Sequence, residues 1–213
     1  MARGCAGDIL ARMMPVLILA AGASSRMRGR DKLSIAIDGV PLLRRQAKMA
    51  LHVSTDVRIA LPPRPHPRYD LVQDLAVDCI EVTDAAEGMG ASLRALFATL
   101  ESDVSAALIL LGDLPDVDAD DLRNLMTAMH THPNALIWRC ATPSGKAGHP
   151  MVVARDVFDD FKALSGDSGG QAILKAAGDA LYLVPLKDER ARRDLDTPED
   201  WAAWEAARKK PLT

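Results

Sequence analysis

One stretch near the amino terminus has the residue types that bind phosphate groups. An apolar run that ends at Leu19 leads into small residues and then into cations: Ala20, Ala21, Gly22, Ala23 and Ser24, followed by Arg26, Arg28, Arg30 and Lys32. Small side chains let backbone N–H groups approach an anion closely, and Arg and Lys supply the charge that phosphate binding requires. The pattern predicts a nucleotide-phosphate loop at the carboxyl end of a first strand.

Two aspartates stand where a carboxylate could hold a metal ion. Asp113 follows the apolar run 108–111, so it could either bind magnesium at the end of a buried strand or simply begin a turn. Asp196 precedes the expected N-cap Thr197 of a last helix, and it could face a metal or only favour the helix dipole. The aspartates at 116, 118, 120 and 121 lack the glycine and the terminal glutamate of a calcium loop, so we expect Asp118 to cap a helix.

Two glycine-rich turns and one histidine are further candidates. The first turn could offer backbone donors to an anion or a base, and it is no dinucleotide fingerprint; its candidates are Gly88, Gly90 and Ser92. The second could close over a substrate or be a plain connection; its candidates are Gly166, Asp167 and Gly169. His149 could act as an acid or base, or be a solvated turn residue ahead of a strand.

Alternating short apolar runs and helical periods predict the elements that hold these residues. Strands are expected at 16–20, 57–61, 79–82, 106–111, 135–140, 151–154 and 181–185. Amphipathic helices are expected after Pro41, over 93–100, around 122–129 and after Thr197. This alternation predicts an α/β fold with a mostly parallel sheet covered by helices on both faces, and ligands in such sheets bind beyond the carboxyl ends of the strands. The proline-rich segment 62–67 is expected to be an exposed loop.

Length and composition bound the remaining choices. The chain has 213 residues, 48% of them hydrophobic, and a formal net charge of -3, which suits one sizeable domain with no bulk attraction to nucleic acid or anionic membrane. Cys5, Cys79 and Cys140 form no zinc or disulfide pattern and suit a reducing cytoplasm. Residues 1–25 imitate a signal peptide, but cleavage would remove the first strand. We therefore expect a loose extension at 1–12, one domain at 13–208 and a tail at 209–213.

The motifs, taken in order, resemble a known enzyme family. The chain contains Leu-Ala-Ala-Gly-x-Ser-Ser-Arg-Met, Gly-Met-Gly-Ala-Ser-Leu, Gly-Asp-Leu-Pro, Gly-His-Pro, Leu-Ser-Gly-Asp-Ser-Gly-Gly and Leu-Asp-Thr-Pro-Glu-Asp, spread over about residues 16–204. This ordered set resembles the nucleotidyltransferases of molybdenum cofactor biosynthesis, and most nearly the CTP:molybdopterin cytidylyltransferases. The resemblance implies a single Rossmann-like domain of the glycosyltransferase-A type that moves a nucleotidyl group onto a phosphate and releases pyrophosphate.

The resemblance also implies roles for the candidate residues. The first loop would wrap the triphosphate, with Ala20, Ala21 and Gly22 meeting the base and ribose. Arg26 and Lys32 would take the phosphates, and Asp113 and Asp196 would bind magnesium. The implied substrates are a nucleoside triphosphate and a phosphorylated acceptor such as molybdopterin, with a molybdoenzyme as an expected maturation partner. His149 and the 165–170 turn would lie on the acceptor side. One extra residue before Gly29 leaves open which of Arg28 and Arg30 would touch phosphate.

The second alanine of the loop bears on the choice of nucleotide. The cytidylyltransferases resemble this chain in having Leu-Ala-Ala-Gly, whereas guanylyltransferases typically show Leu-Ala-Gly-Gly, so Ala21 favours CTP. The alternatives are a GTP-using guanylyltransferase, transfer to another phosphorylated acceptor, a dinucleotide-binding oxidoreductase and a nucleotide-sensing module without activity. The absence of a G-x-G-x-x-G motif argues against the oxidoreductase, and the retention of both Asp113 and Asp196 argues against the sensor.

Overall fold

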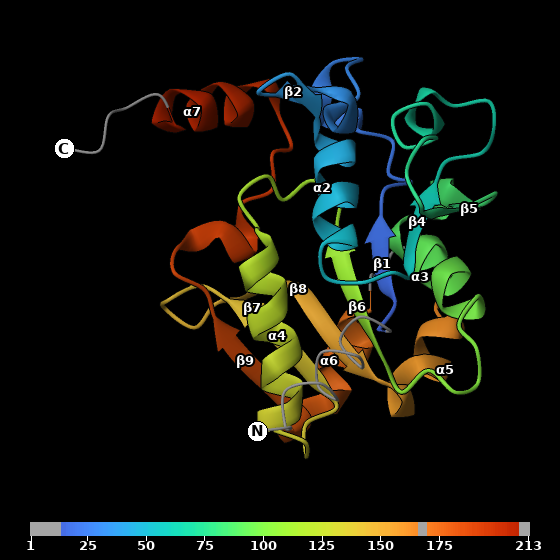
Figure 1. Ribbon diagram of the computed structural model, residues 1–213, viewed down its shortest axis with the longest axis vertical. Helices are drawn as coiled ribbons and strands as arrows, with labels where there is room; N and C mark the ends of the chain where they lie inside the picture. The colour runs from blue at the N-terminus through green and yellow to red at the C-terminus, as the bar shows by residue number, and fades with distance from the viewer. Residues whose placement is uncertain (1–13, 166–169, 209–213) are drawn as a thin grey trace, which may run out of the picture.

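The fold is built on a seven-stranded sheet, seen in a computed structural model that describes residues 14–165 and 170–208. In sheet order the strands are β5 (Asp78–Glu81), β4 (Val57–Leu61), β1 (Val16–Leu19), β6 (Ala106–Leu111), β8 (Ala147–Ala154), β7 (Ile137–Ala141) and β9 (Leu181–Pro185). The carboxyl ends of β1, β4 and β6 lie together at the upper edge of the sheet in Figure 1. This edge is where the predicted phosphate loop leaves β1.

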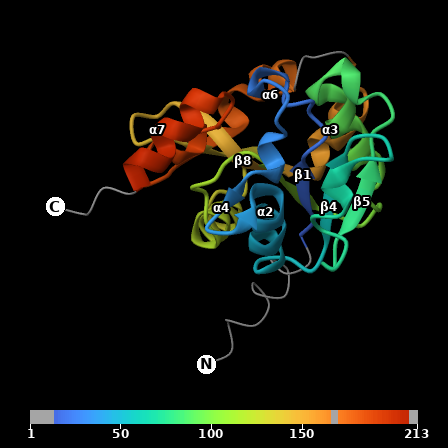
Figure 2. The same ribbon diagram turned by 90° about the horizontal axis from the view of Figure 1, so that it is seen from above.

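Helices cover both faces of the sheet, as Figures 1 and 2 show from two directions. On one face lie α2 (Leu42–Leu51) and α4 (Ala119–Thr131), and on the other lie α3 (Met89–Ala98), α5 (Phe158–Lys162) and α6 (Gln171–Ala177). Strands covered on both faces bury nearly every residue, and all five residues of β4 are buried, Arg58 included. The layered α/β architecture predicted from the sequence is confirmed.

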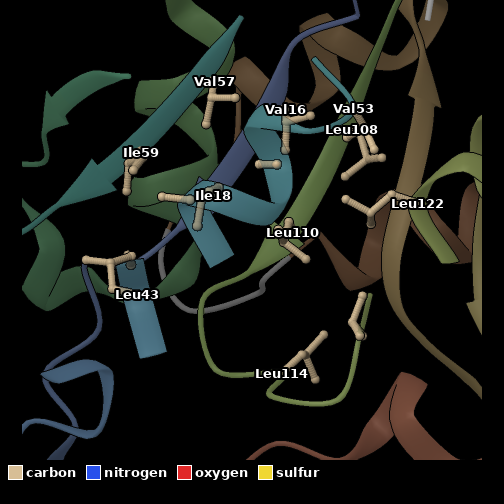
Figure 3. Packing of buried hydrophobic residues seen from close by; sticks show 14 of the residues in the cluster. Val16, Ile18, Leu43, Val53, Val57, Ile59, Leu108, Leu110, Leu114 and Leu122 are labelled. Atoms are coloured by element: carbon tan, nitrogen blue, oxygen red, sulfur yellow. The ribbon is translucent and has the colours of Figure 1, made fainter. Parts of the chain in front are cut away.

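An apolar core lies between the sheet and the helices on each face. The core on the side of α2 and α4 packs the strand residues Ile18, Ile59 and Leu110 against side chains from the helices, and part of it is drawn in Figure 3. The core on the opposite side includes Leu17 and Ile109 together with Phe97, whose ring stacks on Phe161 at a centroid distance of 4.5 Å. Alternate residues of β1 and β6 are therefore buried in one core or the other. This packing on both faces holds the carboxyl ends of the two strands in place.

The sheet is mostly parallel, as the sequence predicted, and the direction of one strand is the main point that was not foreseen. All seven expected strands form, and within this sheet β8 runs antiparallel to both β6 and β7. β8 also begins at Ala147, four residues before its expected start at Met151. The interpretation of His149 as a solvated turn residue is therefore wrong, because it lies within β8 and is only half-exposed.

The helix caps follow the sequence closely. Asp118 accepts hydrogen bonds from the backbone of Asp120 and Asp121, and Asp121 returns one, which forms a full capping box at the start of α4. Thr197 and Asp200 form the same reciprocal pair at the start of α7 (Pro198–Arg208). Both acidic segments therefore cap helices, as we expected.

The last helix, α7, lies at one end of the molecule beside a small two-stranded sheet. That sheet is formed by β2 (Ala36–Ile37) and β3 (Val40–Pro41), and Arg208 of α7 pairs with Asp38 between them at 2.7 Å. The segment 62–66 is the exposed loop that its prolines predicted, and a short 3-10 turn, η3 (Pro67–Tyr69), follows it. Within the described part of the chain, no helix is both long enough and apolar enough to span a bilayer.

Candidate active site

A cavity of about 470 Å³ opens at the carboxyl edge of β1 and β6. Its walls come from the loop after β1, from Lys32, from the start of α3, from Asp113 after β6 and from the segment before α7. These segments are distant in sequence but meet because β1 and β6 are adjacent and parallel. Predicted residues in the lining are Leu19, Ala20, Ala21, Gly22, Ala23, Ser24, Arg26, Lys32, Gly88, Ser92, Asp113 and Asp196.

Arg68 holds the phosphate loop in place. Its guanidinium donates to both carboxylate oxygens of Asp31, at 2.7 and 2.8 Å, to the carbonyl of Ala20 at 2.6 Å and to the Ser24 hydroxyl at 3.1 Å. The Arg68 residue is only 1% exposed. Burial raises the pKa of Asp31, but the hydrogen bonds and charge of Arg68 outweigh it and hold that pKa below its usual value. Both ends of the loop are thus tied to one buried cation.

Lys32 lies between the two predicted metal ligands. Its Nζ is 2.5 Å from Asp113 Oδ2 and 2.7 Å from Asp196 Oδ1, and all three side chains are only 16–17% exposed. Arg26 reaches the other oxygen of Asp196 at 2.6 Å, but its own side chain is 69% exposed. Asp113 Oδ1 is buried and has no hydrogen-bond partner among the described residues. The site therefore joins two carboxylates to two cations and leaves one carboxylate oxygen free to accept.

The charges of this cluster shift one another. Burial lowers the pKa of Lys32, but its interactions with Asp113 and Asp196 outweigh that effect and raise it. Burial likewise raises the pKa of Asp196, yet Lys32 and Arg26 bring it below its usual value. Asp194 differs: it is exposed as a residue, but partial removal of its carboxyl from water and the nearby Asp196 and Asp113 raise its pKa. Lys32 thus stays charged, whereas Asp194 ionises less readily than an ordinary aspartate.

The start of α3 forms the opposite wall of the cavity. Gly88 has φ 109°, a conformation that favours glycine, and this sharp turn brings Ser92 to the cavity lining. Gly90 was expected to take part too, but it is buried inside α3 and absent from the lining, because only the outer side of the first turn faces the cavity. This wall supplies small side chains and backbone groups rather than charge.

Several other candidates lie outside the cavity lining. Arg28 pairs with Glu199 of α7 at 2.6 Å, and neither Arg28 nor Arg30 is in the lining, so the structure assigns the local charge to Arg26 and Lys32. His149 does not line the cavity either. Gly166, Asp167 and Gly169 lie outside the described residues, as do residues 1–12 and 209–213.

Some lining residues were not predicted. They are Ser25, Leu33, Ala85, Ala86, Met89, Leu111 and Asp194. Asp194 stands two residues before Asp196 in the segment that precedes α7, and the close spacing of the two acids was the one signal that could have indicated it. The described residues contain no cluster of three or more metal-binding side chains, so any ion here would need oxygens from a substrate as well.

Comparison with a curated protein gives one partial relative. The chain is 27% identical over 146 residues to the bifunctional protein GlmU of Leifsonia xyli subsp. xyli. That match covers 66% of this chain and 30% of the relative, so the chain corresponds to less than a third of the relative's length.

Solved structures with the same fold cover almost the whole chain. A homologue of Rv0371c from Mycobacterium sp. strain JC1 has a TM-score of 0.76 at 24% identity, covering 91% of this chain and 96% of its own. Rv0371c of Mycobacterium tuberculosis H37Rv in complex with manganese has a TM-score of 0.73 at 22% identity, with 90% and 97% coverage. CMP:2-keto-3-deoxy-manno-octonic acid synthetase in complex with CTP has a TM-score of 0.68 at 18% identity, with 93% and 100% coverage. At these identities the likeness establishes the fold.

The family itself is established by a match to a domain model. Residues 16–181, which run from the first residue of β1 to the first residue of β9, match the MobA-like NTP transferase domain. The matched region includes the phosphate loop, Lys32, the start of α3 and Asp113, and it leaves out only the Asp194–Asp196 side of the cavity. The chain therefore belongs to the MobA-like NTP transferase domain family, a family of nucleotidyltransferases.

Proposed function

We propose that this protein transfers CMP from CTP to a phosphorylated acceptor and releases pyrophosphate, with molybdopterin as the acceptor implied by the sequence resemblance. The observation that carries the proposal is Lys32 Nζ within 2.7 Å of both Asp113 and Asp196, in a cavity whose other wall is a small-residue loop. A lysine paired with two carboxylates, one after β6 and one before α7, suits a triphosphate and a divalent cation together. The likeness to a synthetase solved with CTP supports the choice of cytidine.

The chemistry is a displacement at the α-phosphorus of the triphosphate. An oxygen of the acceptor phosphate forms a bond to that phosphorus, and the bond from phosphorus to the bridging oxygen breaks, so that the electron pair leaves with pyrophosphate. This displacement needs little proton transfer, so positioning and charge neutralisation supply most of the rate enhancement. In the proposed roles Arg26 and Lys32 bind the triphosphate oxygens and stabilise the charge that builds up on the leaving group.

The carboxylates are the residues that would hold a divalent ion. The unpartnered Asp113 Oδ1 fits this role, since a buried carboxylate oxygen without a donor is costly unless a cation or ligand satisfies it. Asp113 and Asp196 would ligate magnesium together with substrate phosphates, and Asp194 lies close enough to alter the affinity. When bound, the ion neutralises charge on the α-phosphate and on pyrophosphate. The manganese complex of a structurally similar protein supports a divalent ion in this fold.

Two measurements test the proposal. The first is thermal unfolding with CTP, GTP, ATP and UTP in the presence of magnesium; selective stabilisation by CTP is expected, because a ligand that binds only the folded state raises its stability. The second is pyrophosphate release by Asp113→Ala at saturating CTP and magnesium, where a loss of about a hundredfold or more is expected. Wild-type turnover in the variant, or stabilisation by GTP equal to that by CTP, would contradict the assignment.

A further inference from the structure

A group of positively charged and imidazole side chains lies at the start of β8, outside the cavity. It consists of Arg139 on β7, His149 on β8 and Arg192 at the end of η7 (Glu189–Arg192). Arg139 Nε donates to the carbonyl of Gly148 at 2.7 Å, and Arg192 donates to the carbonyl of Ala147 at 3.1 Å. Neither arginine has a carboxylate within ion-pair distance in the ranges 14–165 and 170–208. In this the half-buried Arg139 differs from the buried Arg58, Arg68 and Arg190, whereas Arg192 is exposed.

This group lies along the same edge of the sheet as the nucleotide cavity. Ile109 of β6 lies opposite Met151 of β8, so the last residue of β6, Leu111, and the first residues of β8 stand near one edge of the sheet. Leu111 lines the cavity. Arg139 of β7 lies opposite Met151 from the other side, which places it near that edge too. The cationic group is therefore one and two strands away from the cavity, on the side away from β1.

The main chain is shaped to bring Arg192 to this place. A Cβ atom on Gly148 would lie 2.0 Å from the carbonyl oxygen of Ala191, so only glycine lets η7 lie so close to β8. That close contact places the residue after Ala191 beside the first residues of β8, where Arg192 makes its hydrogen bond. The approach of η7 to β8, and with it the position of the Arg192 backbone, is thus set by packing.

The electrostatics of the group favour an anion. Burial and the charge of Arg192 lower the pKa of Arg139, which means that the guanidinium stands in a place that disfavours its charge. Burial and the charge of Arg139 lower the pKa of His149 to about 3, so the imidazole is neutral near pH 7. His149 Nδ1 is buried and has no partner within the part of the chain that the structure describes. A bound oxyanion would pair with the arginines, and the neutral imidazole could donate one hydrogen bond to it.

We propose that Arg139, His149 and Arg192 form a binding site for an oxyanion, a phosphate or carboxylate group carried by the acceptor, beside the triphosphate cavity. This inference rests on the proposed function, because the acceptor must approach from the side of the cavity opposite to the loop after β1. The two sites have different roles: Lys32 and Arg26 bind the triphosphate, and the group at the start of β8 orients the acceptor. Arg139 and Arg192 would thereby determine which acceptors are used.

The test is a calorimetric titration with inorganic phosphate, repeated with acetate, in buffer free of divalent ions. Arg139→Gln and Arg192→Gln are each expected to weaken phosphate binding by about tenfold, since each removes a charge-assisted hydrogen bond. Lys32→Gln is expected to retain this binding, because its phosphate site is a different one. Arg123→Gln is the matched control: Arg123 is an arginine of α4 paired only with Asp120, and its loss should leave phosphate binding unchanged. The more tightly bound of the two anions identifies the group recognised.

A titration with CTP separates failure of this inference from failure of the proposed function. Arg139→Gln and Arg192→Gln should bind CTP as the wild type does, and thermal unfolding should show that Arg192→Gln, an exposed position, folds normally. Phosphate affinity that is unchanged in both arginine variants would overturn the second site. Phosphate binding that disappears in Lys32→Gln alone would assign all of it to the triphosphate loop and overturn the site as well. Absence of CTP binding in the wild type would contradict only the proposed function.

Discussion

Arg68 grips Asp31 through both carboxylate oxygens across 37 residues of sequence, and the same guanidinium holds the Ala20 carbonyl at the start of the phosphate loop. Arg68 is almost fully buried, with 1% of its surface exposed. A buried cation with four hydrogen bonds fixes both ends of the loop. Because the loop is already ordered, it loses little conformational entropy when a ligand binds. The loop is therefore preorganised by a residue that touches no substrate.

Replacing Arg68 should destabilise the fold and weaken nucleotide binding together. Arg68→Gln is expected to lower the free energy of unfolding by about 2–4 kcal/mol, because it leaves Asp31 and the Ala20 carbonyl without their donors. Arg44→Gln is the matched control, since Arg44 grips Asp74 with the same fork at 2.6 and 2.7 Å, but Asp74 is 61% exposed. Its cost should be clearly smaller, because solvent screens an exposed pair. Denaturant unfolding of both variants measures the difference, and equal costs would show that the Arg68 pair is not special.

At neutral pH the negative charge of Asp194 should lower the stability of the fold and favour the binding of a metal ion. Because the pKa of Asp194 is raised in the folded state, its protonation contributes to the free energy of unfolding. This contribution is fully present below the ordinary aspartate pKa of 3.8 and is lost as the pH rises through the folded-state pKa. Without divalent ions, Asp194→Asn should therefore melt slightly higher than wild type at pH 7, by about 2 °C since the residue is exposed, and the gain should vanish near pH 4. Thermal melts across this range test the sign.

The same variant should behave differently when metal and nucleotide are present. Stabilisation by magnesium with CTP should be smaller in Asp194→Asn than in wild type, because one carboxylate near Asp113 and Asp196 has lost its charge. Asp103→Asn, an exposed acid away from the cavity, serves as the control in both conditions. A variant that melts lower than wild type at pH 7 without metal would contradict the proposed repulsion among the three aspartates.

Two glycines at the same edge of the sheet should respond oppositely to alanine. Gly148→Ala would place a Cβ 2.0 Å from the Ala191 carbonyl oxygen, which forces η7 away from β8 and should cost about 3 kcal/mol. Gly22→Ala meets no described atom within 4 Å, so its stability should match or exceed that of wild type by about 0.5 kcal/mol. Since Gly22 lines the cavity, its variant should instead bind CTP more weakly. Unfolding and CTP titration distinguish the two, and a stable Gly148→Ala protein would refute the packing argument.

Local patterns in the sequence predicted most of what the site uses. The strands, the capping boxes at Asp118 and Thr197, and the loop at 19–24 all follow from signals within a few residues. The placement of Asp113 and Asp196 in one cavity followed from the order of motifs and agrees with the geometry. The mostly parallel sheet followed from the alternation of strands and helices, but the antiparallel direction of β8 did not, because an apolar run reads the same for a parallel and an antiparallel strand.

The residues that sequence reasoning missed act over long separations. Arg68 follows a proline-rich loop that carries no signal of its partner, and its role appears only when β4 brings η3 beside the loop after β1. Arg139, which has no acidic partner among the described residues, is likewise visible only in space, since half-buried charge without an acid is a property of packing. Chemistry-bearing loops could thus be read from the sequence, whereas the residues that support them could not.

Ala21 is the residue through which the choice of base can be tested. It is only 5% exposed and lines the cavity beside Ala20, in a wall made of small side chains on both sides. If its methyl group limits the space for the base, Ala21→Gly should admit a purine and raise the ratio of GTP to CTP turnover by about tenfold, the effect of roughly one methyl group in a closed pocket. Ala23→Gly, the same change two residues on in the exposed part of the loop, is the control and should leave the ratio unchanged. Competition between the two triphosphates measures the ratio directly. An unchanged ratio in Ala21→Gly would place the discrimination elsewhere, and Ser92, at the start of α3 on the opposite wall, would be the next residue to exchange.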